Sequence, residues 1–320
     1  MSANLRIPPF ESIAYAGRET GVGLIVTGAV HGNETCGTQG IRRAVAEIQS
    51  GALPVLRGRV TFVPICNPLA YAKGERAGDR NLNRNLAPTA TPKDFEDHVA
   101  NWLCPLMASH EVLLDLHSTR GETEAFALVG PHDNAGAIEP FAHATPERAL
   151  ARRLGVKRFV EGWLDTYARG VARRRAQAAA NPLAADATYG IGTTEYMRSV
   201  GGYAMTLECG QHEDPQSPEV AYRAIRNTLA FLGLTGEPPP PAVERYEALR
   251  MHEVVDRVHP EDRFERPWAS FDAVEPGDLI AKRYDGTAIV APKHGRILFP
   301  DAKALPGNEW FYLAETIAGL

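Results

Sequence analysis

The chain has 320 residues, enough for one large domain plus a small one, or for two domains of middling size. Apolar residues make up 44% and charged residues 23%, which excludes a disordered or fibrous protein. The net charge of −5, the scattered basic residues, and the absence of a signal peptide or of an apolar run of ~20 residues predict a cytoplasmic protein that binds neither nucleic acid nor membrane.

Short apolar runs alternate with helical segments through the first two thirds of the chain. Near-continuous apolar runs separated by helices are typical of a parallel sheet that is covered on both faces. The sequence therefore predicts an α/β fold, with a mixed, largely parallel sheet flanked by helices. We expect strands at residues 21–30, 58–68, 111–118 and 203–210, and helices at residues 36–49, 94–107 and 217–234.

The remaining segments of the chain have different patterns. Residues 146–180 carry apolar positions at helical spacing and predict one or two surface helices. The proline-rich segment 235–244 predicts a stiff connector, which divides the chain into a domain at 1–236 and a smaller C-terminal β domain at 243–320. Within that second domain, residues 277–300 read as short strands joined by Asp-Gly and His-Gly turns.

Four cysteines, at positions 36, 66, 104 and 209, lie far apart and form no C-x-x-C pair. This spacing argues against a disulfide framework and against a cysteine zinc site. We expect all four to be buried free thiols.

Polar residues follow the predicted strands at their carboxyl ends, where open α/β sheets bind ligands. His31 and Glu34 follow the first strand, Asn67 the second, His117 ends the third, and Glu208 ends the fourth. Two histidines and one carboxylate are a common ligand set of a catalytic zinc ion. We therefore predict one zinc ion per chain, held by His31, Glu34 and His117, with the glycines around the first pair allowing the loop to bend tightly.

Each of these residues also has an interpretation without function. The H-x-x-E spacing occurs by chance, and His117 could be a histidine with ordinary core partners. Glu208, at the end of an apolar strand, could belong to a buried ion pair or could act as a general base and proton donor, and we favour the second. Asp115 could accept a hydrogen bond from His117 or be a turn residue.

The segment GERAGDRNLNRNL, residues 74–86, brings Arg76, Arg80 and Arg84 together with two asparagines. Guanidinium groups bind carboxylates with two hydrogen bonds, and one beside a metal could stabilise an oxyanion. The alternative is a solvated charged surface. Because residues 74–86 follow the second predicted strand, we favour the first interpretation, which implies a small substrate that bears carboxylates.

The motifs HGNE, NPLA, RAGDRNLNR, DLHS and TLECG, in this order, resemble the succinylglutamate desuccinylase and aspartoacylase family, zinc enzymes with a carboxypeptidase-like domain. The resemblance covers essentially the whole chain, including the C-terminal β region. It implies that His31, Glu34 and His117 are the zinc ligands and that Glu208 is the general base.

For the substrate, the resemblance assigns Arg76 to the scissile carbonyl, the Asn83–Arg84 pair to a substrate carboxylate, and Arg198 to further substrate binding. Two positions depart from the family pattern. Ser118 stands where aspartoacylases have an asparagine, and Tyr312 is a weak candidate for the tyrosine that the family's β domain lends to the pocket.

The resulting hypothesis is a zinc-dependent amidohydrolase that acts on linear amides, an N-acyl amino acid deacylase. The alternative is a zinc carboxypeptidase acting on peptides. A carrier protein lacks support because no Met-Lys-Met hairpin is present, and a dinucleotide-binding protein lacks support because Gly21 and Gly23 precede their strand. The acyl group and homo-oligomerisation are left open.

Overall fold

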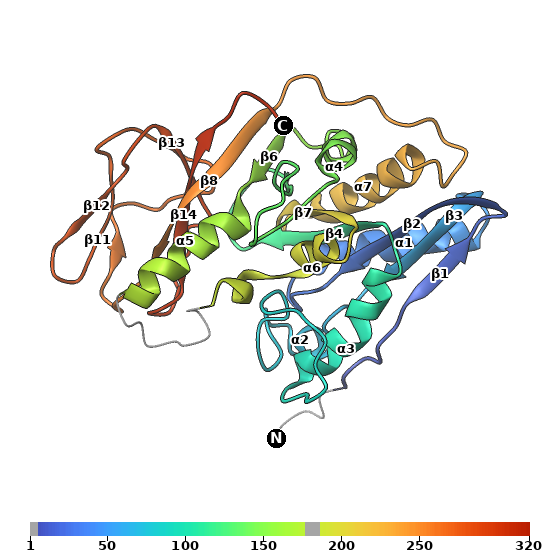
Figure 1. The fold of residues 1–320 in the computed structure, drawn as a ribbon, viewed down its shortest axis with the longest axis horizontal. Helices are drawn as coiled ribbons and strands as arrows, with labels where there is room; N and C mark the ends of the chain where they lie inside the picture. Colours follow the sequence, from blue (N-terminus) through green and yellow to red (C-terminus); the bar gives the residue numbers. More distant parts are fainter. Residues whose placement is uncertain (1–5, 177–185) are drawn as a thin grey trace.

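One large mixed sheet runs through the computed structural model, which describes residues 6–176 and 186–320 (Figure 1). Within these residues, eleven strands pair in the order β1-β3-β2-β4-β7-β5-β6-β8-β14-β13-β10, and three more form a second sheet in the order β12-β11-β9. The strands are β1 (Ile13–Ala16), β2 (Glu19–Gly28), β3 (Arg57–Val63), β4 (Val112–Thr119), β5 (Phe126–Leu128), β6 (Arg158–Glu161), β7 (Tyr203–Gln211), β8 (Glu247–Asp256), β9 (Arg263–Phe264), β10 (Ala273–Val274), β11 (Leu279–Lys282), β12 (Ala288–Val290), β13 (Gly295–Leu298) and β14 (Glu309–Thr316).

Helices cover both faces of the sheet (Figure 1). Apolar side chains of α1, α4 and α7 form one core with the strands, and those of α3 and α6 form another core on the opposite face. The helices are α1 (Cys36–Gln49), α2 (Pro68–Lys73), α3 (Phe95–Ala108), α4 (Ala144–Ala151), α5 (Trp163–Ala176), α6 (Thr193–Ser199) and α7 (Ser217–Phe231), with a 3-10 turn η2 (Ala187–Gly190) before α6.

The four predicted apolar runs form the parallel centre of the sheet. Strand β2 pairs in parallel with β3 and β4, and β4 pairs in parallel with β7. All residues of β4 are buried, because helices cover it from both sides. The predicted α/β fold, with a mixed sheet flanked by helices and a C-terminal β region, is confirmed, and all four cysteines are buried and free as expected.

The C-terminal β region continues the large sheet. Strand β8 pairs in parallel with β6, and β14 pairs antiparallel with β8. Beyond them, β9 to β13 enclose a core of their own around Ile280, Trp310 and Phe311. The predicted Asp285-Gly286 turn is present, with Gly286 at φ 86°. The division at residues 236 and 243 stays a prediction.

The segment predicted as one or two helices at 146–180 contains two helices and a strand between them. The prediction missed β6, because four residues are too few to show a period distinct from the helices around them. Gly162, at φ 86°, follows β6 and directly precedes α5. Residues 177–180 lie outside the described residues. Among the helices described, none combines the length and apolarity needed to cross a bilayer.

Helices α1 and α7 pack closely at Gly40, which generates the first prediction. A Cβ atom at Gly40 would lie 2.9 Å from both the Ala221 Cβ and the Tyr222 backbone nitrogen. Alanine favours a helix by ~1 kcal/mol over glycine, but overpacking costs roughly 1–3 kcal/mol. We expect Gly40→Ala to lower the free energy of unfolding measured with denaturant. The exposed neighbour Gln39→Ala is the control, and a Gly40→Ala protein as stable as wild type would contradict the close packing.

Candidate active site

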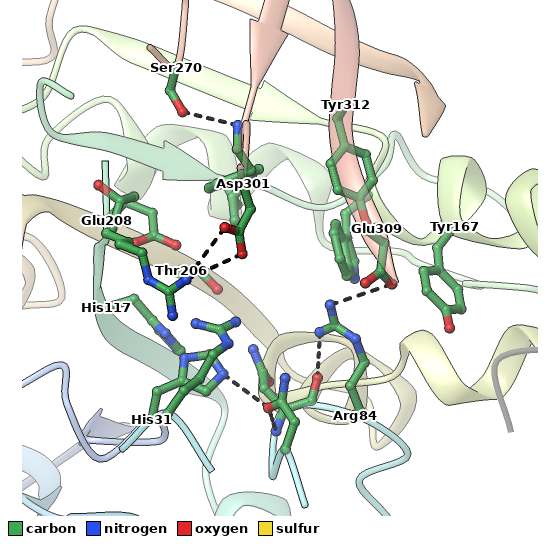
Figure 2. Close-up of a pocket in the computed structure, with 18 of the residues that line it drawn as sticks. His31, Arg84, His117, Tyr167, Thr206, Glu208, Ser270, Asp301, Glu309 and Tyr312 are labelled. Atoms are coloured by element: carbon green, nitrogen blue, oxygen red, sulfur yellow. Dashed lines mark hydrogen bonds and ion pairs between the residues drawn. The ribbon is translucent and has the colours of Figure 1, made fainter. Parts of the chain in front are cut away.

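A cavity of about 630 Å³ lies beside the carboxyl ends of β2, β4 and β7. Its walls come from these strands, from the loop at residues 76–84, from α5 and α6, and from the C-terminal segments 268–270 and 299–312. Figure 2 shows His31, His117 and Glu208 at one end and Arg84, Glu309 and Tyr312 at the other. The cavity therefore joins the parallel sheet to the C-terminal β region.

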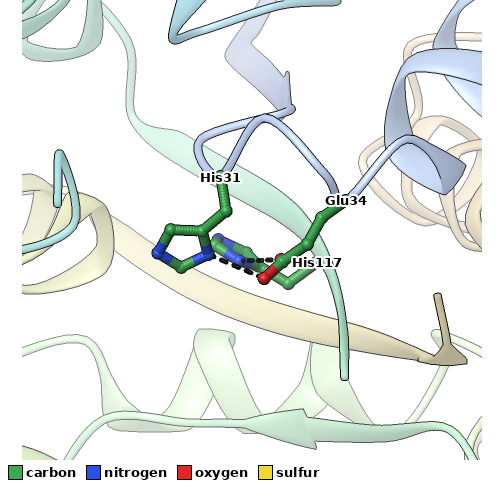
Figure 3. A group of neighbouring side chains, drawn as sticks. All are labelled: His31, Glu34 and His117. Carbon is green, nitrogen blue, oxygen red and sulfur yellow. Dashed lines mark hydrogen bonds and ion pairs between the residues drawn. The ribbon is translucent and has the colours of Figure 1, made fainter. Parts of the chain in front are cut away.

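The three predicted metal ligands meet in this cavity. His31, Glu34 and His117 are all buried, and each offers a ligand atom within 4.8 Å of the others. The Nδ1 atoms of both imidazoles face the same carboxylate, at 2.9 Å from His31 to Oε1 and 2.8 Å from His117 to Oε2 (Figure 3). Tertiary structure thus brings together two residues from the loop after β2 and one from β4.

The second nitrogen of each imidazole has a fixed acceptor. His117 Nε2 donates to Asp115 Oδ2 at 2.8 Å, and His31 Nε2 donates to Asn81 Oδ1 at 3.0 Å. Asp115 is itself held by the hydroxyls of Thr27 and Thr193. Such outer contacts set the tautomer and the orientation of ligand histidines. Asp115 therefore lies in a strand as an acceptor for His117 and is no turn residue.

Electrostatics of the three residues suit a cation. Burial lowers the pKa of His117, but Asp115 and Glu34 outweigh it and hold that pKa well above its usual value. Burial, followed by Arg76, lowers the pKa of His31 to about 4. The His117 ring lies between two carboxylates, Asp115 and Glu34, which together favour a positive charge on the ring. A bound divalent ion would supply this charge in place of a proton. The donor set of two imidazoles and a carboxylate fits zinc.

The loop that carries His31 and Glu34 is confined by close contacts. A Cβ atom on Gly32 would lie 2.0 Å from the Ala70 carbonyl carbon, and one on Gly37 would lie 2.7 Å from the Leu116 Cβ. The residue with positive φ in this loop is Ala29, at 47°. Gly32 and Gly37 therefore allow the backbone of the loop to approach α2 and β4 closely. The left-handed conformation that the prediction would place at a glycine is adopted by Ala29 instead.

Glu208 lies beside His117 on the neighbouring strand, because the β4–β7 register pairs these two residues. Its side chain is buried, and its Oε2 atom has no hydrogen-bond partner among residues 6–176 and 186–320. Burial, with a further contribution from Glu34, raises the pKa of Glu208 to about 7. A carboxyl group with such a pKa can both accept and return a proton near neutral pH.

The arginine-rich loop contributes two of its three arginines to the cavity. Arg76 donates to Glu34 Oε1 at 2.9 Å, while its side chain is 47% exposed. Arg84 lies over the Trp163 ring, 4.8 Å from its centroid, and 3.9 Å from Glu309. Arg80 instead pairs with two acids of α3, so it holds the loop to that helix.

Two predicted asparagines have different surroundings. Asn83 lines the cavity, and its Oδ1 accepts from the Thr193 backbone N–H at 2.9 Å. Asn67 is fully buried, accepts from the Ala70 N–H and donates to Glu96. It caps α2 and does not line the cavity, so the structure gives it a structural role.

Arg198 lies in α6 and lines the cavity, but its side chain is only 3% exposed. Its guanidinium pairs with the carboxylates of Glu139, Glu147 and Glu195. Its assignment to substrate binding stays a prediction, and among the described residues its guanidinium also donates to the Ala204 carbonyl.

Sequence patterns did not indicate several residues of the cavity wall. His212 Nδ1 and the Ser118 hydroxyl are 2.9 Å apart, beside the third predicted ligand. Trp163 and Tyr167 come from α5, to which no chemistry had been assigned. Tyr312, by contrast, was a candidate from the resemblance. It lies in the cavity wall on β14, and its buried hydroxyl has no hydrogen-bond partner within the described residues. An aromatic spacing of four in α5 was a visible but unspecific signal.

Comparisons with known proteins find a matching family model and several similar deacylases. Residues 20–144 match the family model described as the succinylglutamate desuccinylase/aspartoacylase catalytic domain. The chain is 26% identical over 307 residues to a succinylglutamate desuccinylase of Pseudomonas paraeruginosa, which covers 91% of this chain and 83% of that protein. It is also 36% identical over 120 residues to an N-acyl-aromatic-L-amino acid amidohydrolase (carboxylate-forming) of Rattus norvegicus, covering 32% of this chain and 35% of that protein.

Solved structures show the same fold. A succinylglutamate desuccinylase/aspartoacylase from Rhodobacter sphaeroides superimposes with a TM-score of 0.71 at 15% identity, covering 96% of this chain and 90% of that one. The product-bound ectoine utilization protein EutE (DoeB) from Ruegeria pomeroyi gives a TM-score of 0.68 at 20% identity, covering 94% and 87%.

The convergence of the three ligands predicts that zinc stabilises the fold. Because the ion would bind the folded chain only, free zinc at about 100 times its Kd should add roughly 2.7 kcal/mol to the free energy of unfolding. Thermal unfolding of chelator-treated protein with and without added zinc measures this. His117→Ala should abolish the zinc-dependent rise in Tm, whereas His98→Ala, an exposed histidine of α3, should keep it. An equal rise in both variants would show that zinc binds elsewhere.

Proposed function

We propose that this protein is a zinc-dependent deacylase, which hydrolyses the amide bond of an N-acyl amino acid, and the match of residues 20–144 to the succinylglutamate desuccinylase/aspartoacylase catalytic-domain model supports this proposal. The observation that carries the proposal is the adjacency of His31, Glu34 and His117 to a buried glutamate with a raised pKa. The products would be a carboxylic acid and a free amino acid.

His31, Glu34 and His117 would hold the metal ion. When bound there, zinc would act as a Lewis acid toward the scissile carbonyl and lower the pKa of water. The hydrogen bonds that the two imidazoles donate to Asp115 and Asn81 would keep both rings turned toward the ion. With the ion bound, the Glu34 carboxylate would be shared between the ion and Arg76, whose half-exposed guanidinium lines the cavity.

Glu208 is suited to move the proton. Its free oxygen is buried in the cavity wall next to His117, so it can take a proton from the attacking water and return it to the leaving nitrogen. Arg76 is suited to stabilise the negative charge that develops on the carbonyl oxygen, because hydrogen bonds from a guanidinium strengthen as that charge grows.

The far end of the cavity would hold the amino acid. Arg84 lies there and is oriented by stacking on Trp163, and Asn83 precedes it in the cavity wall. A carboxylate of the substrate is the group that this pair would bind. The C-terminal segment 299–309 forms the opposite wall, and Asp301 reaches across to Arg120 at 3.4 Å. Such a wall favours a small substrate over the alternative of a peptide.

The role of Glu208 predicts a specific loss. Glu208→Gln keeps the size of the side chain but removes the proton acceptor, so kcat should fall on the order of 10²- to 10⁴-fold, while zinc content stays near one per chain. Steady-state kinetics and metal analysis of the purified variant measure both. Glu213→Gln, an exposed acid five residues later, should retain wild-type kcat. Wild-type turnover by Glu208→Gln would remove Glu208 from the reaction.

The wall formed by segment 299–309 predicts that the cavity accepts small substrates. We expect acetyl, succinyl and longer acyl amino acids to be hydrolysed with kcat/KM at least 10-fold above that of tripeptides and longer peptides. A panel assayed for release of free amine separates the classes. Efficient removal of C-terminal residues from peptides would favour the carboxypeptidase alternative instead.

A further inference from the structure

The surroundings of Arg198 are more acidic than those of a carboxylate receptor. Its Nη1 donates to Glu139 Oε1 at 2.8 Å, and its Nε donates to Glu147 Oε2 at 3.2 Å. Glu195 Oε1 lies 3.6 Å from the same Nη1. Three carboxylates therefore surround one guanidinium, and the cluster carries a formal charge of −2 when all are ionised.

The three acids differ in what else holds them. Glu147 accepts hydrogen bonds from the backbone N–H groups of Gly130 and Ala204, which fixes it as a structural acid. Glu195 accepts from the Gly192 N–H at 2.9 Å and from the Thr194 hydroxyl, at the start of α6. For Glu139, the described contact of the carboxylate is Arg198 alone.

Glu139, Glu195 and Arg198 all line the cavity. The Glu139 side chain is 14% exposed, against 3% for Arg198. A group that enters from the cavity therefore meets carboxylate oxygens around a guanidinium each of whose three nitrogens already donates to an acceptor. A second carboxylate on the substrate would be repelled at this place.

Burial raises the pKa of Glu139 to about 7, although Arg198 opposes the rise, and Glu195 and Glu147 add to it. The positive charge of Arg198 therefore does not fully offset the effect of burial on the Glu139 carboxylate. A cation placed beside it would lower its pKa and be bound more tightly in return.

We propose that the cluster of Glu139, Glu195 and Arg198 selects an amino acid with a positively charged side chain, so that the substrate is an N-acyl derivative of a basic amino acid. The inference rests on the proposed deacylase function and names its substrate class. The amine of the side chain binds Glu139 and Glu195, while the α-carboxylate binds Asn83 and Arg84.

The two parts of this subsite are connected through α6. The Asn83 Oδ1 accepts from the N–H of Thr193, the first residue of the helix, and Glu195 and Arg198 follow in the same helix. The carboxylate-binding pair and the acidic cluster therefore have fixed relative positions, as recognition of two opposite charges on one small molecule requires.

The wild-type protein tests the inference first. With whichever acyl group is hydrolysed, Nα-acyl-L-ornithine and Nα-acyl-L-lysine should show kcat/KM at least 10-fold above the N-acyl-L-aspartate and N-acyl-L-glutamate derivatives. N-acyl-L-norleucine, which lacks the amine, should lie well below the lysine derivative. A preference for the acidic substrates would overturn the inference, and so would equal rates for norleucine and lysine.

Glu139→Gln provides the second test. Glutamine can still accept from Arg198, so the fold should be retained, but the cluster loses one negative charge. The ratio of kcat/KM for the basic over the acidic substrate should fall by 10-fold or more, with most of the change in KM for the basic substrate. Glu244→Gln, the same exchange at an exposed position of the connector, should leave the ratio unchanged.

Outcomes for the function and for the inference are separable. An unchanged ratio in Glu139→Gln would overturn the assignment of the cation to this cluster. If no acyl amino acid is hydrolysed, the proposed function fails. Calorimetric binding of Nα-acetyl-L-lysine and N-acetyl-L-glutamate to the zinc-loaded protein then decides the inference alone, because tighter binding of the glutamate compound would overturn it.

Discussion

The parallel pairing of β4 with β2 on one side and β7 on the other is the constraint on which the site depends. The β4–β7 register sets His117 beside Glu208, and the β2–β4 register sets the loop after β2 at the same edge. A shift of one residue would turn His117 to the opposite face. The buried, almost wholly apolar centre of the sheet therefore fixes His117, a proposed metal ligand, beside Glu208, and the loop after β2 brings His31 and Glu34 to the same edge.

Sequence patterns were sufficient for this part of the molecule because its constraints are local and repetitive. The runs at 111–118 and 203–210 are largely apolar on both faces, as expected of strands under two layers of helices, and His117 and Glu208 stand near their carboxyl ends. His31, Glu34 and His117 converge as predicted because parallel strands end at one edge. The helix at 36–49 matches α1 because its apolar spacing is uninterrupted.

Pairings between distant segments could not be predicted in the same way. Glu139 and Glu147 lie 59 and 51 residues before Arg198. No periodicity connects Glu139, in an irregular segment, or Glu147, in α4, to an arginine in the short helix α6. Arg80 and Arg84 have the same residue type and the same loop, yet one pairs with α3 and the other stacks on Trp163. Strand β6 was not predicted for another reason. Its four residues are too few to show a strand pattern, and their pairing with β5 and β8 defines them as a strand.

These distant pairings also decide what the site can select. The end of the cavity with His31, Glu34 and His117 is built from the parallel strands and the loop after β2, and the proposed hydrolysis there acts on an amide bond that all N-acyl amino acids share. The other end is built from α5, α6 and β14, which reach the cavity only because β6 and β8 carry the large sheet on into the C-terminal region. There the charges are arranged in opposed groups, with Arg84 and Arg174 near Glu309 and with Arg198 among three acids. Within the described residues the acids around Arg198 make no hydrogen bond to His31, Glu34 or His117, whereas Thr193 at the start of α6 donates to Asp115, the acceptor of His117. Charges around Arg198 can therefore vary with little effect on the proposed ligands as long as Thr193 keeps this contact.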